Sequence, residues 1–235
     1  MCGDTGASIN PGPIDASTDI ETGEVNFNER YLSEIDPDLN YFNNAEYNFS
    51  NFNSYTIDEL KDTNINTSGG FNIMHHNCRS ILSHGKLDNY YNLLDLLGNP
   101  FDIIGLTETW LNASNVNTPM FNEYKYNHVY QTRTLDNFES KERGGGLSLF
   151  IRDNILYKLR DDLSVLTSYL ELLFVEINLN NKIYLIGVTY RIPNTNIKLF
   201  TDEINSILEK IRTKYEVFLM GDFNICLLYP CLNHG

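Results

Sequence analysis

The chain has 235 residues and 42% hydrophobic content, which is enough for a domain with a substantial core and excludes a wholly disordered protein. The net charge of −14 is uneven: residues 1–70 hold 13 Asp and Glu against Arg30 and Lys61, a net of −11, which leaves −3 for residues 71–235. No window approaches the roughly 18 apolar residues of a membrane-spanning helix, so we expect no membrane partner.

Residues 1–70 form an acidic, Asn-rich segment whose aromatic residues follow neither a helical nor an alternating pattern. Such a segment buries too little apolar surface to offset its chain entropy, so we expect it to be disordered or weakly structured. The alternative interpretation is an acidic interaction tail. Within this segment, the stretch "YTIDELKD" predicts a short helical turn.

The start of the sequence does not resemble a secretory signal. Its first ten residues, "MCGDTGASIN", have neither the basic start nor the apolar run of a secretory signal. The four cysteines show neither paired metal-ligand spacing nor a disulfide framework. We therefore expect an intracellular protein in a reducing compartment, either nuclear or cytoplasmic.

From Phe71 onward the sequence indicates an α/β domain, residues 71–235. "FNIMHHN" predicts a strand, "KLDNYYNLLDLLGN" predicts a helix that Gly98 ends, and the apolar run "FDIIGLTE" predicts a strand buried on both faces. Because a strand–helix–strand unit makes the two strands parallel, Asn77 and Glu108 should lie at neighbouring carboxyl ends, the edge where α/β sheets bind ligands.

The middle of the chain predicts an antiparallel or mixed portion of sheet. Four strand candidates follow one another: "GGGLSLFI", "ILYKLRD", "YLELLFVEINL" and "KIYLIGVTYR". A helix with a regular apolar stripe comes next, in "IKLFTDEINSILEKIRTK", and we expect Thr201 to be its N-cap. "EVFLMGDFN" predicts a further buried strand, whereas His84 and His128 are expected in loops.

Polar residues follow the apolar runs at four strand ends. They are Asn77, Glu108, Tyr190 with Arg191, and Asp222 with Asn224. A single acid at a strand end is usually a cap or a solvated loop residue, but four such ends suggest a common site. Carboxylates suit a hard divalent cation, amides can orient phosphate oxygens, and a phenol can stabilise a developing anion.

These motifs resemble the endonuclease/exonuclease/phosphatase superfamily. The resemblance covers about residues 71–226 and rests on the order and spacing of "HHNCRS", "DIIGLTETWL", "RGGGLSLFI", "LELLFVEI", "GVTYRIPN" and "FLMGDFNI". The wording is most similar to the endonuclease domain of non-LTR, LINE-type, jockey-like retrotransposon polyproteins. The resemblance implies a four-layer, mixed-sheet α/β sandwich that hydrolyses phosphodiester bonds in DNA with Mg²⁺ or Mn²⁺ and without an organic cofactor.

The resemblance also implies roles for individual residues. Glu108 would be the principal metal ligand, and Asp222 would position and activate the attacking water. Asn77 and Asn224 would hold the scissile phosphate, while Tyr190 would lie near the phosphate or the leaving oxygen. This division of roles agrees with general phosphoryl-transfer chemistry, in which a cation neutralises charge and protein groups orient the nucleophile.

A DNA substrate would also require cationic contacts. We predict that Arg191 and Arg79 bind the phosphate backbone. A net charge of −3 over residues 71–235 does not by itself indicate a basic surface. Arg79, Arg133, Arg143, Arg152 and Arg191 could still line one edge while the acids lie elsewhere, an arrangement that the sequence does not determine.

The end of the sequence departs from the retrotransposon pattern. Cys226 stands where that pattern usually has Asp, and the expected Ser/Thr-Asp-His element does not follow "GDFNI". We expect His234 not to replace the histidine of that element, and we expect a truncated domain with impaired activity. Two alternatives stay open: a non-catalytic mobile-element remnant, and a phosphatase or lipid phosphodiesterase of the same superfamily.

Overall fold

The computed structural model describes residues 55–62, 71–133, 144–179, 182–211 and 213–225. Most of the predicted acidic segment, the "LLYPCLNHG" end and three of the four cysteines lie outside the described residues. The helical turn predicted at "YTIDELKD" is present as α2 (Ile57–Asp62). A capping box starts it, because Glu59 N donates to Thr56 Oγ1 (3.2 Å) and Thr56 N donates to Glu59 Oε2 (2.6 Å).

The first of two sheets contains the predicted parallel pair. Its strands are β1 (Ile73–Asn77), β2 (Ile103–Thr107), β3 (Tyr126–Gln131) and β4 (Leu147–Arg152), in the order β1-β2-β4-β3. β1 and β2 are parallel, with Asn77 opposite Thr107, and β4 runs antiparallel to β2 and β3. The prediction that Asn77 and Glu108 share one sheet edge is therefore confirmed.

The second sheet contains three of the four strand candidates from the middle of the chain, whereas the fourth, "GGGLSLFI", is β4 of the first sheet. The strands of the second sheet are β5 (Tyr157–Leu159), β6 (Val165–Leu166), β7 (Leu170–Leu179), β8 (Lys182–Arg191) and β9 (Glu216–Asp222). β7 is antiparallel to β5, β6 and β8, whereas β8 and β9 are parallel, with Tyr190 opposite Asp222. The ends of β8 and β9 that carry Tyr190 and Asp222 consequently lie next to each other.

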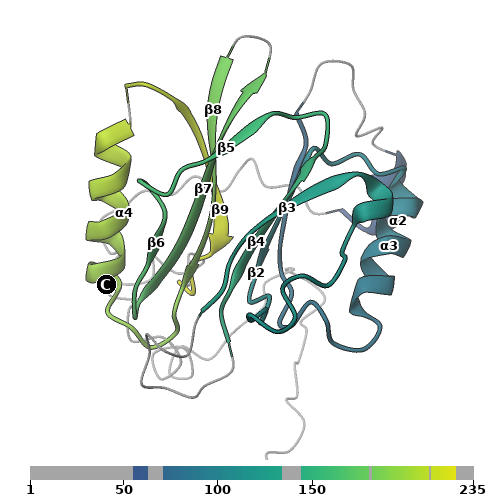
Figure 1. The fold of residues 1–235 in the computed structure, drawn as a ribbon, viewed down its shortest axis with the longest axis horizontal. Helices are drawn as coiled ribbons and strands as arrows, with labels where there is room; N and C mark the ends of the chain where they lie inside the picture. Colours follow the sequence, from purple (N-terminus) through teal and green to yellow (C-terminus); the bar gives the residue numbers. More distant parts are fainter. Residues whose placement is uncertain (1–54, 63–70, 134–143, 180–181, 212, 226–235) are drawn as a thin grey trace, which may run out of the picture. The chain divides into compact units, whose positions relative to one another are not determined.

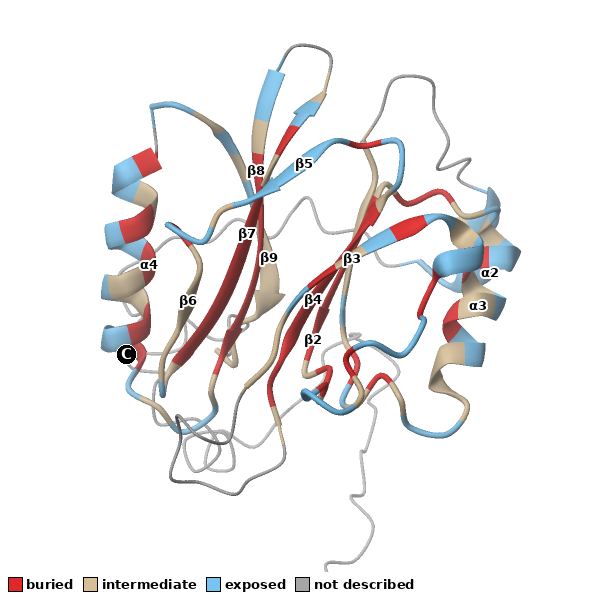
Figure 2. Ribbon diagram, in the orientation of Figure 1, coloured by how far each residue is buried: buried red, intermediate tan, exposed pale blue. Residues whose placement is uncertain are grey.

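The two sheets and two helices form four layers (Figure 1). Buried apolar residues of β2, β3 and β4 pack against those of β7 and β8 between the sheets. The helix α3 (Lys86–Leu97) covers the outer face of the first sheet, and α4 (Ile197–Ile211) covers the outer face of the second. Figure 2 shows the buried stripe of each helix turned toward its sheet. This arrangement confirms the predicted mixed-sheet α/β sandwich.

Both helices form where the spacing of apolar residues predicted them, but the N-cap of α4 differs from the prediction. α3 buries Tyr90 and Leu94 and ends at Gly98, whose φ of 69° is the left-handed conformation that glycine adopts readily. α4 begins earlier than expected, so Thr201 lies inside the helix and is not the N-cap. Asn196 takes that role, because its Oδ1 accepts a hydrogen bond from Lys198 N at 2.8 Å.

The predictions of a buried strand at β9 and of a loop at His128 were wrong. β9 is only partly buried, and Phe218 keeps 44% of its surface exposed, because β8 is the strand partner of β9 within the described residues. β3 was not predicted at all, and His128 belongs to it and not to a loop. His128 Nε2 lies 2.9 Å from Ser148 Oγ on β4, and its ring stacks on Phe150 at 4.4 Å.

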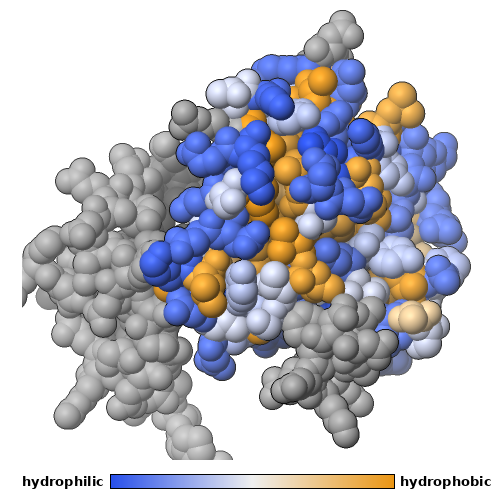
Figure 3. Space-filling view, turned by 60° about the vertical axis from the view of Figure 1, so that its left-hand side comes forward, coloured by the Kyte–Doolittle hydropathy of each residue, from blue (hydrophilic) through white to orange (hydrophobic). Residues whose placement is uncertain are grey.

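Some large apolar side chains reach the surface. Leu156, Leu199 and Phe218 are 83, 50 and 44% exposed. On the face shown in Figure 3, a hydrophobic strip is bordered by hydrophilic side chains. In the part of the chain that the structure describes, no helix is long and apolar enough to cross a membrane.

Candidate active site

Three of the predicted site residues meet where strands from the two sheets end. Asn77 ends β1, Glu108 follows β2, and Asp222 ends β9. Asn77 Nδ2 donates hydrogen bonds to Glu108 Oε1 at 2.8 Å and to Asp222 Oδ2 at 2.5 Å. One carboxamide thus holds two carboxylates at the same point, which stabilises a pair of like charges that would otherwise repel each other.

The backbone of Glu108 adopts an uncommon conformation. Its φ is 53°, in the left-handed region that non-glycine residues seldom occupy. Main-chain hydrogen bonds hold it there on both sides: Ser80 N donates to Glu108 O at 2.8 Å, and Thr109 N donates to Gly146 O at 3.1 Å. Such backbone strain is concentrated at functional sites, where the surrounding structure maintains it.

Asp222 is fixed by two donors. Its Oδ2 accepts from Asn77 Nδ2, and its Oδ1 accepts from Asn224 N at 3.0 Å. Asn224 also has a positive φ, of 47°, and its side-chain Nδ2 donates to Arg191 O at 2.6 Å. The Asn224 side chain is therefore bonded to the end of β8, and the described contacts do not join it to Asn77 or Glu108.

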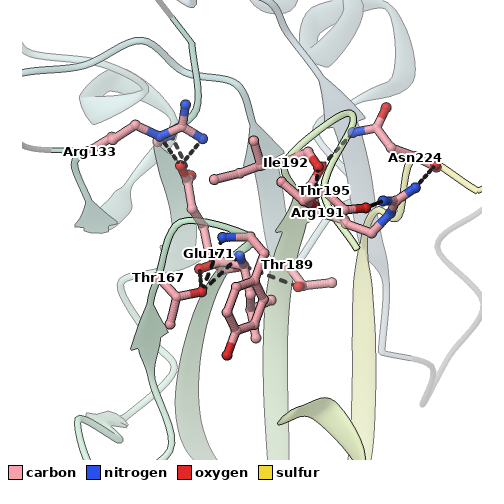
Figure 4. A network of polar contacts seen from close by, with 11 residues as sticks. Arg133, Thr167, Glu171, Thr189, Arg191, Ile192, Thr195 and Asn224 are labelled. Carbon is pink, nitrogen blue, oxygen red and sulfur yellow. Dashed lines mark hydrogen bonds and ion pairs between the residues drawn. The ribbon is translucent and has the colours of Figure 1, made fainter. Parts of the chain in front are cut away.

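Arg191 is buried beneath the strand ends. Only 2% of its surface is exposed. Its guanidinium donates to the main-chain oxygens of Thr195 (2.6 Å) and Asn224 (2.8 Å), as Figure 4 shows. It also donates to the main-chain oxygen of Phe223 (3.0 Å). In this geometry Arg191 ties the loop after β8 to the chain after β9. Contact between Arg191 and a substrate phosphate stays a prediction.

Tyr190 lies next to these groups and is 4% exposed. Burial, followed by the negative charge of Glu108, raises the pKa of Tyr190 above its ordinary value. The phenol is therefore protonated at neutral pH and can donate a hydrogen bond. Arg133 Cζ lies 5.9 Å from the centre of the Tyr190 ring.

The sequence interpretation missed Glu171, which is 1% exposed. Glu171 Oε1 accepts from Arg133 Nε at 2.6 Å, and Oε2 accepts from Gly146 N at 2.7 Å. Figure 4 shows the Arg133 guanidinium directed at this carboxylate. A signal was present in the sequence, since an acid inside the apolar run "YLELLFVEI" has to be paired when the strand is buried.

The arginines do not gather along one exposed edge. Arg79 is exposed just beyond Asn77. Arg152 instead donates to the main-chain oxygens of Phe101 and Asn99, at the other end of the first sheet, and Arg133 is paired with Glu171. Arg143 lies outside the described residues. Of the described candidates, Arg79 is the one placed on the surface beside the site.

The donor set fits a hard divalent cation. Glu108, Asp222 and the carbonyl oxygen of Asn77 are oxygen ligands of the kind that Mg²⁺ and Mn²⁺ prefer. Within the described ranges, no group of three or more His, Cys, Asp and Glu could hold a metal ion. A cation at Glu108 would thus depend on water and substrate oxygens for most of its ligands, as Mg²⁺ often does.

The sequence profile of the Endonuclease/Exonuclease/phosphatase family matches residues 66–230, and the chain belongs to this family. Members of this family are typically nucleases or phosphodiesterases and are generally dependent on divalent metals. No curated protein matches the sequence.

Several solved structures have a similar fold at low sequence identity. The human Nocturnin catalytic domain with bound sulfate is 17% identical over 68% of this chain and 66% of that one, with a TM-score of 0.48. The endonuclease domain of TRAS1, a telomere-specific non-LTR retrotransposon, is 14% identical over 67% and 62%, with a TM-score of 0.47. D. rerio TDP2 complexed with single-strand DNA product is 14% identical over 66% and 61%, with a TM-score of 0.46. The chain therefore spans about two thirds of the length of these structures.

Proposed function

We propose that the chain is a divalent-metal-dependent phosphodiesterase that nicks DNA, of the type found in retrotransposon endonuclease domains. Residues 71–235 would form the catalytic domain, and residues 1–70 a separate acidic segment. The observation that carries the proposal is the bridge from Asn77 Nδ2 to Glu108 Oε1 (2.8 Å) and Asp222 Oδ2 (2.5 Å). Family membership and the wording of "NCRS", "LTETWL" and "YRIP" support it.

In this proposal Glu108 and Asn77 hold the cation, Mg²⁺ or Mn²⁺, which supplies positive charge to the phosphate when it is bound. Asp222 orients and activates the attacking water. Two donors fix the Asp222 carboxylate, so little reorganisation is needed when a substrate arrives. Its orientation is thus set by the protein and not by the substrate.

The remaining polar groups would act on the phosphate. Tyr190 donates its phenolic proton toward the phosphate or the leaving oxygen, because its raised pKa keeps it protonated. Asn224 would hold the scissile phosphate through its second amide hydrogen, since the first is donated to Arg191 O. Both amide hydrogens of Asn77 are donated to Glu108 and Asp222, so Asn77 would act on the phosphate through the cation and not as a direct donor. Exposed Arg79 would contact a neighbouring backbone phosphate.

A small phosphoester is the second candidate substrate. Arg133, Arg152 and Arg191 are bonded to groups of the protein itself, and the chain has a net charge of −14. A long polyanion needs a basic surface more than a single phosphate group does. A phosphatase or lipid phosphodiesterase activity would accord with this distribution of charge.

Cation binding is the first test. Titration calorimetry with Mn²⁺ should give saturable binding to the wild-type chain and none to Glu108→Gln. Asp88→Asn removes an exposed acid on α3 and should bind Mn²⁺ like the wild type. Equal binding by wild type and Glu108→Gln would remove Glu108 from the metal site.

Cleavage is the second test, with supercoiled plasmid and a chromogenic phosphodiester as substrates. The proposal expects plasmid nicking that chelation abolishes, and a loss of at least about 100-fold in Glu108→Gln and Asp222→Asn. Cleavage of the small diester alone would replace DNA nicking by the second candidate. A folded protein that binds Mn²⁺ and cleaves neither these two substrates nor a chromogenic phosphomonoester would contradict both.

A further inference from the structure

We propose that Glu171 is a positioning residue for this site: together with Arg133 it fixes the segment Gly145–Gly146, and through that segment it sets the backbone of Glu108 and the placement of Tyr190. This inference rests on the proposed function for its consequence in catalysis. The contacts themselves are properties of the folded chain. Glu171 touches neither substrate nor cation in this scheme.

Both oxygens of the Glu171 carboxylate are used. Arg133 Nη2 and Nε lie 2.5 and 2.6 Å from Oε1, and Gly146 N lies 2.7 Å from Oε2. Burial raises the pKa of Glu171, and Arg133 and Gly146 offset part of that rise. A buried ion pair seldom stabilises a fold more than an apolar pair of the same size would, so its presence here suggests a role in setting geometry.

The chain of contacts continues from Gly146 to Glu108. Thr109 N donates to Gly146 O at 3.1 Å, and Trp110 N donates to Gly145 O at 3.0 Å. Thr109 and Trp110 directly follow Glu108 in the chain. Their hydrogen bonds to the glycine segment therefore help to hold Glu108 at its left-handed φ of 53°. The glycines approach their neighbours closely, since a Cβ at Gly145 would lie 2.2 Å from Glu171 Oε1 and one at Gly146 would lie 2.7 Å from Thr109 Oγ1.

A second branch reaches Tyr190. Glu171 and Tyr190 are directly opposite each other in the β7–β8 pair, so their side chains lie on the same face of the sheet. The Arg133 guanidinium, held by Glu171, lies 5.9 Å from the Tyr190 ring centre. The Glu171–Arg133 ion pair is thus connected to both Glu108, the proposed metal ligand, and the phenol of Tyr190.

Trp110 offers a readout that does not depend on activity. It is the single tryptophan of the chain, and its main chain is bonded to Gly145. The double variant Glu171→Leu with Arg133→Met removes the ion pair and the acceptor for Gly146 N without leaving a buried charge. In the metal-free protein we expect a shifted Trp110 emission maximum and stronger quenching by acrylamide.

The control removes a different ion pair, one whose carboxylate is also on β7. Arg160 Nη1 lies 2.8 Å from Glu176 Oε2, and Glu176→Leu with Arg160→Met should leave the Trp110 signal unchanged. If the Glu171 double variant does not fold, Glu171→Gln serves, with a smaller change in the same direction. A folded variant whose Trp110 signal equals that of the wild type would overturn the proposal.

The values of kcat and KM distinguish a positioning role of Glu171 from a merely structural one. If the wild type cleaves a phosphodiester, the Glu171 variant should lose about 10- to 100-fold in kcat with little change in KM. A changed KM with an unchanged kcat would overturn the positioning role. If the wild type cleaves nothing, the proposed function fails, whereas the Trp110 comparison still decides whether Glu171 orders this segment.

Discussion

Asn77 and Asp222 are 145 positions apart in the sequence, yet Asn77 Nδ2 donates to Asp222 Oδ2 at 2.5 Å. The contact joins the end of β1 in one sheet to the end of β9 in the other. The same amide group bonds Glu108 Oε1 at 2.8 Å. The candidate site is therefore assembled by the packing of two sheets and not by any local stretch of the chain.

We predict that Asn77→Asp destabilises the metal-free protein by about 1–3 kcal/mol, because a donor is replaced by a third negative charge beside two carboxylates. Mg²⁺ should restore more stability to this variant than to the wild type, since bound cation stabilises the folded state by mass action. Urea unfolding with chelator and with MgCl₂ measures both effects. Asn89→Asp, on the exposed face of α3, is the control; an equal loss under both conditions would contradict the prediction.

Arg191→Met should lower the free energy of unfolding by about 3 kcal/mol. Three main-chain oxygens lose a charged donor, and the variant no longer ties the loop after β8 to Asn224. Arg79→Met should change stability by less than about 0.5 kcal/mol, because Arg79 is exposed. Chemical denaturation compares the two.

Arg79→Met also tests a predicted DNA contact. If Arg79 binds a phosphate, Arg79→Met should weaken DNA binding and reduce the slope of log K against log[salt] by about 1. Fluorescence anisotropy with labelled duplex over a range of salt concentrations gives this slope. An unchanged slope would remove Arg79 from the interface.

The pattern of apolar residues and glycines within each segment predicted much of this fold. The apolar stripe of α3, its end at Gly98 and the continuous run of β2 are features that neighbouring residues determine. They place Asn77 and Glu108 at one sheet edge without any structure. The start of α4 was missed because Thr201 and Asn196 are both acceptable N-caps, and only the helix register separates them.

Features that depend on partners far along the chain were not predictable in this way. β3 is a strand because β4 pairs with it, and its burial does not alternate regularly. Glu171 gains its role from Arg133 and Gly146, which are 38 and 25 positions away. The buried position of Arg191 was not predicted either, because the main-chain oxygens that it bonds come from two separate loops.

His128 should make stability depend on pH. Burial lowers its pKa from 6.5 to about 4, so between these values the unfolded chain binds a proton that the folded protein does not. Above pH 6.5, His128 does not lower the free energy of unfolding. As the pH falls from 6.5 to about 4, it lowers the free energy of unfolding by an increasing amount, which reaches about 3 kcal/mol near pH 4. Urea unfolding across this range should show a shallower pH dependence for His128→Gln than for the wild type.

The matched control for this effect is His84→Gln, at an exposed histidine before α3. It should retain the pH dependence of the wild type. Protonation of carboxylates also lowers stability near pH 4, so the comparison between variants, and not the wild-type curve alone, decides the matter. Parallel curves for His128→Gln and the wild type would refute the assignment.

Gly221→Ala should destabilise the protein by about 3 kcal/mol or more and should displace Asp222, its neighbour in β9. A Cβ at Gly221 would lie 2.0 Å from the main-chain oxygen of Thr189, and relief of this contact requires β8 and β9 to separate. Thermal and urea unfolding measure the loss, and Mn²⁺ titration reports on the site.

Gly105→Ala is the matched control for Gly221→Ala. Its Cβ would lie 2.6 Å from Cε of Met220, the end of a flexible side chain that can turn aside, so we expect a loss of about 1–2 kcal/mol. Both variants add one methyl group near β9, but only the first one presses on the backbone that carries Asp222. If Gly105→Ala were the more damaging change, the tight approach of β8 to β9 at Thr189 would not be what positions Asp222.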